Sequence, residues 1–449
     1  MTGGVMEVRR RTLAAARRSE GRYGPQGGRR SALAVWLARR DVQDGGLAGL
    51  IVLARIPANF GMPGALAFLL LATFYAVLRP EQVRAVFTRC WMFLVIPLFA
   101  LASVGWSAFP MVTLRAAVQM ALTIMAGLLL SQSSRPRVVV AGLFVAYAVY
   151  TLLTLALVPL RPIENGQSLA LYGLGGEVKN YFSDTASTAS LLALTMAALF
   201  AEQRAPLRMM LALGVTGLCV WTTVRANSAG GLAALAVSGA LLVVLLLLLR
   251  ERSRGVKLAF VCMVVLWLIG ILCFFDTILA HVQQMSEKDS GLTGRGYLWF
   301  RAHFIIAERP LLGYGYAAFW HAENPDAVGL WHHFDLRQES TGFSFHNTFL
   351  QTIVETGLVG LAVLLATWLA GCLALLRRFV LTASLPTCFW LAYMALQLTK
   401  TPVELIRPTG LVAPTILLGI ALGFGCFPVG RDQAIALRVR RGPQSSASG

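Results

Sequence analysis

The stretch NSAGGLAALAVSGALLVVLLLLL, residues 227–249, contains no charged residue and is almost entirely apolar. At a rise of 1.5 Å per residue, a helix of about 20 such residues crosses the ~30 Å hydrocarbon core of a bilayer. A second, nearly uncharged run covers residues 256–275. Of the 449 residues, 57% are hydrophobic and only 13% are charged, which is too little charge for the surface of a soluble chain of this length. The sequence therefore predicts an all-α, polytopic membrane helical bundle and shows no alternating strand pattern of the outer-membrane barrel type.

Eleven apolar segments are clear membrane-spanning candidates, and a twelfth, at 46–60, is weaker because it contains Arg55 and Pro57. The eleven lie at 62–79, 90–106, 113–131, 136–158, 183–202, 207–223, 227–249, 256–279, 347–376, 380–398 and 411–428. With twelve spans, both termini share one side, and that side carries more than twice as many Lys and Arg residues as the other. Because positive charge is enriched on the cytoplasmic side, we predict about twelve spans with both termini in the cytoplasm.

This topology gives the chain a simple organisation. A basic tail at 1–45, expected to be disordered and not a signal peptide, precedes nine spans within 46–279. A large extracytoplasmic loop at 280–345 follows, then three spans within 346–428 and a basic tail at 429–449. The formal net charge of +18 is then explained by cytoplasmic anchoring to anionic lipid of the bilayer, so no nucleic-acid partner is expected.

The cysteines and the cytoplasmic connections carry no recognisable chemistry. All seven cysteines fall in or at the edge of apolar segments and are expected to be small core residues; they are Cys90, Cys219, Cys262, Cys273, Cys372, Cys388 and Cys426. No CxxC or Cys/His zinc spacing occurs, so neither a metal nor a cofactor is expected. The short cytoplasmic connections contain no P-loop and no dinucleotide fingerprint, so a nucleotide-sugar substrate is not indicated.

The polar chemistry gathers on the outer side, in the loop 280–345 and at the start of the next span. All six histidines lie between residues 281 and 346. A short helix is expected at about 295–308, because an apolar face runs along this segment until Pro310 ends it. The following stretch, SFHNTFLQTIVETGLVG at 344–360, places three polar residues at four-residue steps on one helix face; they are Asn347, Gln351 and Glu355.

Several motifs occur in a recognisable order. They are GWSAFPMVTLRAAVQMALTIMAGLLL (105–130), GEVKNYFSDTASTASLLAL (176–194), TTVRANSAGGLAAL (222–235), TGRGYLWF (293–300), ERPLLGYGYAAFW (308–320) and FHNTFLQTIVETGLVGL (345–361). Together they resemble the O-antigen ligase and polymerase family of bacterial envelope glycosyltransferases, from about residue 60 to 428. The resemblance implies a multi-pass protein of the bacterial inner membrane whose large loop is periplasmic.

The resemblance also implies an activity and a site. Members of the family take a glycan from a polyprenyl-diphosphate carrier on the outer face and transfer it to another glycan or to lipid A core, in lipopolysaccharide or exopolysaccharide biosynthesis. By position, Arg225 and Arg295 are expected to bind the diphosphate, and Lys179 is a further candidate for phosphate. His346 is expected to help the attacking hydroxyl as a catalytic residue. Asn347 is expected either to orient His346 or to cap the helix.

The residue types fit this chemistry. Arginine stays charged and grips phosphate with two hydrogen bonds, and histidine titrates near the operating pH of a general base, so the scheme needs no metal. Four further residues are expected to have supporting or structural roles: Arg115, Glu355, Gln351 and Asn180. Arg115 lies just inside a span, where a charge needs a partner, and Asp184 or Glu355 is expected to supply it. Glu355 lies deeper than His346 and is expected to lock its helix to a neighbour.

Two classes of function remain open. The first is a metal-independent glycosyltransferase, for which we favour polymerisation of O-antigen or exopolysaccharide repeats over ligation to lipid A core, because the Lys-Asn turn at 179–180 resembles that of exopolysaccharide polymerases. The second is a glycolipid transporter or flippase, which twelve spans would also suit. We see no internal repeat between the two halves, and the polar residues gather at one face, so the sequence favours the enzyme. A structural membrane subunit is a third, weaker reading.

Overall fold

The computed structural model describes residues 39–57, 60–163, 169–251, 253–273, 295–336 and 343–428. The chain divides into two units, Met1–Gln43 and Asp44–Gly449. Of the first unit only residues 39–43 are described, and the account below concerns the second. Most of the predicted tail at 1–45, the tail at 429–449, His281 and part of the long loop lie outside the described residues.

The described chain is helical apart from one short antiparallel hairpin, β1 (Arg161–Pro162) with β2 (Leu169–Ala170). The helices are α3 (Arg40–Leu53), α4 (Gly61–Leu78), α5 (Pro80–Arg89), η2 (Trp91–Leu94), α6 (Val95–Ala102), η3 (Ser103–Gly105), α7 (Pro110–Ser131), α8 (Pro136–Leu157), α9 (Lys179–Glu202), α10 (Pro206–Arg225), α11 (Ala229–Leu248), α12 (Arg254–Cys273), α14 (Arg295–Glu308), α15 (Pro325–His333), α16 (Thr348–Thr382), α17 (Leu385–Lys400) and α18 (Ala413–Gly425). The predicted all-α class is confirmed.

The helices follow the predicted spans closely, because each apolar run satisfies its backbone hydrogen bonds internally. Each of the twelve predicted segments contains a helix. Seven helices of the described chain are long and apolar enough to cross a membrane: α4, α7, α8, α9, α10, α11 and α16. Helix α5 and the stretch Trp91–Gly105 form a pair bent by 81°, and α18 is a shorter apolar helix. The full count of twelve spans stays a prediction.

The weak first span differs in its bounds from the prediction. A span at 46–60 was expected, but α3 begins at Arg40 and ends at Leu53. Pro57 cannot continue a helix, and the guanidinium of Arg55 donates hydrogen bonds to the carbonyl oxygens of Leu411 and Gly61 beyond the helix end. The arginine that weakened this span in the sequence therefore lies after the helix, in a turn.

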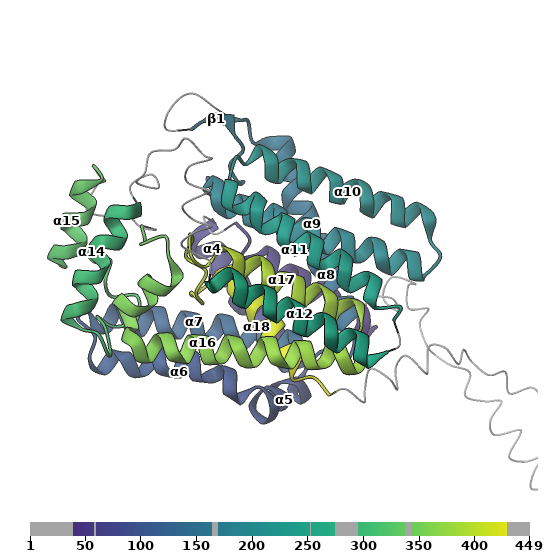
Figure 1. Cartoon of the computed structure of the whole chain (residues 1–449), viewed down its shortest axis with the longest axis horizontal. Coiled ribbons are helices and arrows are strands. Elements are labelled where there is room, and N and C mark those ends of the chain that lie inside the picture. The colour runs from purple at the N-terminus through teal and green to yellow at the C-terminus, as the bar shows by residue number, and fades with distance from the viewer. Residues whose placement is uncertain are drawn as a thin grey trace, which may run out of the picture. The chain divides into compact units, whose positions relative to one another are not determined.

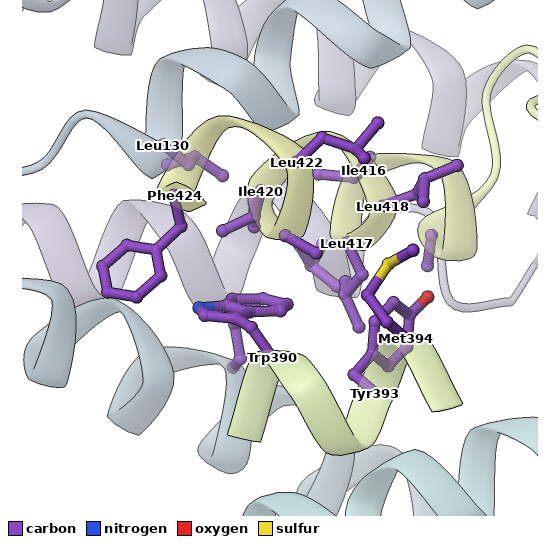
Figure 2. Packing of buried hydrophobic residues seen from close by; sticks show 14 of the residues in the cluster. Leu130, Trp390, Tyr393, Met394, Ile416, Leu417, Leu418, Ile420, Leu422 and Phe424 are labelled. Carbon is purple, nitrogen blue, oxygen red and sulfur yellow. The ribbon is translucent and has the colours of Figure 1, made fainter. Parts of the chain in front are cut away.

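The centre of the bundle is packed through helices α7, α17 and α18. A Cβ atom at Gly127 of α7 would overlap the carbonyl oxygen of Ile416 in α18, so the two backbones come close only because this position is glycine. On the other side of α18, Trp390 and Tyr393 of α17 pack against residues such as Leu417 (Figure 2). This core holds the short connection between α17 and α18 in a fixed place at the end of both helices.

A second hydrophobic cluster lies in the long segment between α12 and α16. Helix α14 has the predicted bounds and buries Leu298, Ala302 and Ile305. These residues share a cluster with Trp331 of α15 and with Phe345, directly before α16. Figure 1 shows α14 and α15 at the end of the bundle where α16 begins. The cluster therefore fixes the segment that carries His346.

Helix α16 is broken at Gly357, whose φ of 67° lies in the left-handed region. The RPLLGYG segment of the loop docks against this break. The amide nitrogens of Tyr314 and Gly315 donate to the carbonyl oxygens of Val354 (3.0 Å) and Glu355 (2.7 Å). On the other side of the break, Leu358 N–H donates to the carbonyl oxygen of Pro310 (2.8 Å). The loop thus supplies the backbone partners that the helix loses, as a polar group in a membrane bundle requires.

Replacing Gly357 with alanine is expected to destabilise the chain. An alanine at positive φ costs about 1–3 kcal/mol, and its Cβ would overlap the carbonyl oxygen of Leu311. The thermal unfolding midpoint of the purified chain in detergent should fall clearly. The matched control is Gly239→Ala in α11, where a Cβ meets nothing within 4 Å; it should hold or raise the midpoint, since alanine favours a helix. Equal midpoints for the two variants would contradict this reading of the kink.

Candidate active site

The side chain of Glu404 brings together three elements that are far apart in the sequence. It lies in the connection between α17 and α18. Its Oε1 accepts hydrogen bonds from Nδ2 of Asn180 (2.9 Å) and from a guanidinium nitrogen of Arg295 (3.2 Å). Its Oε2 lies 3.5 Å from Nδ1 of His346. Three residues singled out from the sequence, on α9, α14 and the start of α16, therefore meet at one carboxylate that the sequence analysis did not single out.

The backbone around Glu404 is held on both sides. Thr348, the first residue of α16, donates its hydroxyl to the Glu404 carbonyl oxygen (2.7 Å) and accepts from the amide of Ile406 (2.8 Å). Its own amide donates to the carbonyl oxygen of Thr401 (2.9 Å). Arg295, the first residue of α14, donates to the carbonyl oxygen of Val403 (2.8 Å). The start of α16 and the start of α14 are thus fastened to the same short connection.

His346 is presented by an unusual backbone. Its φ of 48° lies in the left-handed region, which a non-glycine residue adopts at some cost in energy. Directly after it, Asn347 caps α16, because its Oδ1 accepts from the amides of Phe349 (2.9 Å) and Leu350 (3.1 Å). Of the two roles expected for Asn347, the structure displays the cap. The turn leaves about one third of the His346 side chain exposed, next to Glu404.

The surroundings keep the Glu404 carboxylate ionised. Burial by itself would raise the pKa of this group, but the His346 ring 3.5 Å away and the charges of Arg295 and Lys400 together hold its pKa below the usual value. A carboxylate close to Nδ1 can hold the imidazole ring in one orientation. The other ring nitrogen, Nε2, is then able to accept a proton from a substrate, which is the logic of a histidine oriented by a carboxylate.

A second carboxylate, Glu355 of α16, makes several short contacts with neighbouring segments. Its Oε2 pairs with Arg407 (2.5 Å) and accepts from the amide of Ala317 (2.6 Å), and its Oε1 accepts from Gln351 (2.5 Å). The Gln351 oxygen in turn accepts from the amide of Phe345 (3.1 Å), next to His346. Gln351 and Glu355 therefore join α16 to the segment that precedes it and to the α17–α18 connection.

Breaking this buried pair should cost far more than breaking a surface pair. Replacing Arg407 with leucine leaves an uncompensated buried charge, which typically costs about 3–5 kcal/mol. Arg137→Ala, which removes the exposed pair with Glu202, should cost about 0–1 kcal/mol. The measurement is the unfolding midpoint of each purified variant. The double variant Glu355→Gln/Arg407→Leu should recover part of the loss; if it recovers nothing, the charge of Glu355 is not what destabilises the single variant.

The partner expected for Arg115 was wrong. Arg115 is exposed on α7, whereas Glu355 pairs with Arg407 and Asp184 pairs with Lys400 (2.6 Å). Gln397 also donates to Asp184 (3.3 Å). The two acids predicted to neutralise Arg115 are thus paired with Lys400 at the end of α17 and with Arg407 in the α17–α18 connection, which sequence spacing along single helices does not reveal.

The remaining two candidates, Lys179 and Arg225, lie around one turn. Nζ of Lys179 lies 3.5 Å from the carbonyl oxygen of Asn227, in the turn that follows Arg225. Arg225 is exposed at the end of α10, with its guanidinium 5.8 Å from the ring of Trp221. Within the part of the chain that the structure describes, no contact joins Arg225 to His346 or Arg295. Asn180, the neighbour of Lys179 in the sequence, donates a hydrogen bond to Glu404.

Sequence reasoning missed the residues of the α17–α18 connection, TKTPVELIRPTG. This short segment carries Lys400, Glu404 and Arg407 between two apolar helices. Three charges within eight residues, between two apolar helices, are the signal that could have indicated it. All three contact residues of α9, α14 or α16.

A cavity of about 360 Å³ extends from this connection into the bundle. It lies among α9, α17 and α18, and Glu404 and Asn180 are part of its lining. Glu177, also in the lining, accepts a hydrogen bond from the hydroxyl of Tyr150 (2.8 Å). Burial, together with the charge of Asp184, raises the pKa of Glu177 to about 8, although the Tyr150 bond lowers it. At neutral pH, Glu177 is therefore largely protonated and can both donate and accept hydrogen bonds.

Comparison with known proteins adds two findings. Residues 214–365 match the family model described as O-antigen ligase. The chain is also 28% identical over 295 residues to the exopolysaccharide production protein ExoQ of Rhizobium meliloti (strain 1021). That match covers 65% of this chain and spans 66% of the relative's length. The predicted resemblance is confirmed.

The residues that match the O-antigen ligase model supply only part of the site. Arg225, Arg295 and His346 lie inside residues 214–365, whereas Asn180 and Glu404 lie outside them. The contacts at Glu404 therefore join the O-antigen ligase region to the helices on both sides of it in the sequence.

Proposed function

We propose that this chain is a glycosyltransferase of the bacterial inner membrane that polymerises O-antigen or exopolysaccharide repeat units from a polyprenyl-diphosphate-linked donor. The observation that carries the proposal is the meeting of His346 and Arg295 at Glu404. This arrangement places a candidate base beside a candidate phosphate ligand, on a carboxylate that orients both. The O-antigen ligase match and the exopolysaccharide relative support the same reaction class.

In the proposed reaction, a hydroxyl of the acceptor glycan attacks the anomeric carbon of the donor sugar. The new carbon–oxygen bond forms as the bond to the carrier diphosphate breaks, and the diphosphate leaves with the electron pair. Nε2 of His346 takes the hydroxyl proton, and Glu404 stabilises the imidazolium that forms. The His346 side chain is about one third exposed, just before α16, which leaves it accessible to a substrate.

Arginines stabilise the leaving group in this scheme. A diphosphate leaves readily, so the main requirement is a fixed positive charge where negative charge develops. Arg295 is held by Glu404 and the Val403 carbonyl, and this fixes its position at the start of α14. Arg225 and Lys179, which lie around one turn, are proposed to bind the diphosphate from the other side. The scheme assigns no step to a metal.

The proposed placement in the membrane rests on the distribution of positive charge along the chain. The proposed orientation has both termini in the cytoplasm and the loop 280–345 in the periplasm, because positive charge is enriched on the side of the termini. His346, Arg295 and Glu404 then lie at the periplasmic ends of their helices. A carrier-linked glycan in the outer leaflet reaches this end, and the acceptor is a growing glycan or, for a ligase, lipid A core.

Surface glycan in a deletion strain distinguishes the candidate functions. A polymerase predicts loss of long chains, with single repeat units still made and displayed. A ligase of the same family predicts long chains that stay on the carrier. A flippase predicts carrier-linked glycan trapped in the cytoplasmic leaflet, and this result would contradict a transferase role. Gel separation of the glycans and lectin accessibility of the carrier-linked pool are the measurements.

A further inference from the structure

Helix α5 lies between two apolar segments of the chain. Helix α4, directly before it, is long and apolar enough to cross a membrane, and the stretch Trp91–Gly105, directly after it, is bent from α5 by 81°. A short helix that turns by nearly a right angle between two spans runs along the membrane surface. Figure 1 shows α5 at the edge of the bundle, next to α6. In the predicted topology this surface is the cytoplasmic one.

Buried contacts hold one side of α5 against the bundle. Arg79, directly before α5, is 5% exposed and pairs with Asp44 of α3 through Nε (2.9 Å) and a second guanidinium nitrogen (2.8 Å). The hydroxyl of Ser133, just after α7, donates to the other oxygen of Asp44 (2.8 Å). Gln82 and Val86 of α5 are buried as well. The opposite side of α5 is therefore presented outward in a fixed position.

The outward side of α5 combines aromatic and basic side chains. Phe87 is 57% exposed, and Trp91, two residues after the helix, is 61% exposed. Arg84 stands one helical turn before Phe87, so both lie on the same side, and Arg89 ends the helix. Both arginines are exposed, and within the described part of the chain neither takes part in an ion pair. Glu81 is the one acid of α5, so the helix keeps a net positive charge.

This combination selects the class of partner. A soluble phosphate would pair with the arginines but would leave the rings of Phe87 and Trp91 in water. A second copy of the chain, meeting the same face, would bring like charges together. A phospholipid offers both a phosphate and acyl chains, and aromatic rings are enriched at the boundary between the two. A zwitterionic headgroup also carries an ammonium group that repels arginine, so an anionic headgroup fits best.

We infer that the outward side of α5 binds an anionic phospholipid in the leaflet on the side of the chain termini. Arg84 and Arg89 bind the headgroup phosphate, and Phe87 and Trp91 pack beside the upper part of the acyl chains. Because α5 is fastened to α3 through the buried pair of Arg79, this contact sets the level of these helices in the membrane. The inference goes beyond the proposed glycosyl transfer and does not depend on it.

The test is photocrosslinking from α5 in the purified full chain, reconstituted in vesicles of equal parts phosphatidylglycerol and phosphatidylcholine. The crosslinker benzoylphenylalanine replaces Phe87, an exposed aromatic position, and mass spectrometry gives the ratio of the two lipids captured. We expect phosphatidylglycerol to exceed its share of the bilayer. Arg84→Ala/Arg89→Ala should reduce that ratio by about 5-fold, the scale of basic side chains at an anionic surface. Arg84→Lys/Arg89→Lys should keep most of the preference, because both charges remain.

Two controls isolate the site. Arg208→Ala/Arg250→Ala removes the same charge from exposed positions of other helices and should leave the ratio at Phe87 unchanged. The same crosslinker at Leu70, 63% exposed near the middle of α4, should capture both lipids in their bulk proportion. The unfolding midpoint of Arg84→Ala/Arg89→Ala should equal that of the native chain, since both side chains are exposed.

Three outcomes would overturn the inference. Capture of the two lipids at Phe87 in their bulk proportion would show that α5 does not select a headgroup. A preference for phosphatidylglycerol that survives Arg84→Ala/Arg89→Ala would show that these arginines do not bind it. Crosslinks from Phe87 to a second copy of the chain, in place of lipid, would make α5 an interface between copies.

Discussion

Replacing His346 with alanine is expected to leave the chain folded in the membrane and to reduce glycan transfer by about 10²- to 10⁴-fold, the usual contribution of a positioned general base. The side chain is about one third exposed, and the helix cap that follows it belongs to Asn347. The substitution therefore removes little packing. The measurement is the rate of carrier diphosphate release by the purified protein, with the membrane level of each variant determined in parallel.

The control for His346 is another histidine of the same outer loop. His303 is exposed on α14 and its Nδ1 contacts the carbonyl oxygen of Trp299 in its own helix. His303→Ala should keep nearly the native rate. A His346→Ala protein that transfers glycan as fast as His303→Ala would remove His346 from the mechanism.

Replacing Glu404 with glutamine should lower the rate by about 10²- to 10⁴-fold, the scale known for losing the carboxylate that orients a catalytic histidine. Glutamine keeps the size of the side chain and can still accept from Asn180 or Arg295. It cannot hold a negative charge beside His346. The loss should therefore appear mainly in kcat, since an imidazolium forms only as the reaction proceeds.

A purely structural role for Glu404 would give a different result. In that case Glu404→Gln would lower the unfolding midpoint, and the active fraction that remained would have the native kcat. Glu323→Gln, at an exposed acid of the same outer loop, should change neither quantity. The comparison of kcat with the unfolding midpoint therefore separates orientation of His346 from simple stabilisation of the α17–α18 connection.

The fold was largely predictable because length and apolarity decide where a membrane helix forms. Each predicted span contains a helix, and α14 has the predicted bounds. The predicted bounds of the first span were wrong by several residues. The helix ends before Arg55 and Pro57, which interrupt the apolar run. The break of α16 at Gly357 was not predicted either. It depends on a loop backbone that docks from elsewhere in the chain, and hydropathy along one segment carries no such signal.

The types of residue in the candidate site could be predicted, but most of the contacts between them could not. His346 and Arg295 come from two separate sequence motifs, and the structure brings them to one carboxylate. That carboxylate, Glu404, belongs to a connection with no motif of its own. The pairing of Glu355 with Arg407 was missed for the same reason, because ion pairs between separate helices are set by packing and not by spacing. Arg225 was expected to bind the diphosphate, and its described contacts lie at its own turn.

The most direct measurement is a reaction with purified protein in vesicles of defined lipid. The native chain and the His346→Ala variant are each supplied with a polyprenyl-diphosphate-linked repeat unit at the face that carries the loop 280–345, and the glycan chains and free carrier diphosphate are measured. We expect the native chain to make longer carrier-linked glycan and to release one carrier diphosphate for each unit joined, and the variant to do neither at a comparable rate. Movement of the intact carrier-linked unit across the bilayer, without any release of diphosphate, would contradict the proposed transferase.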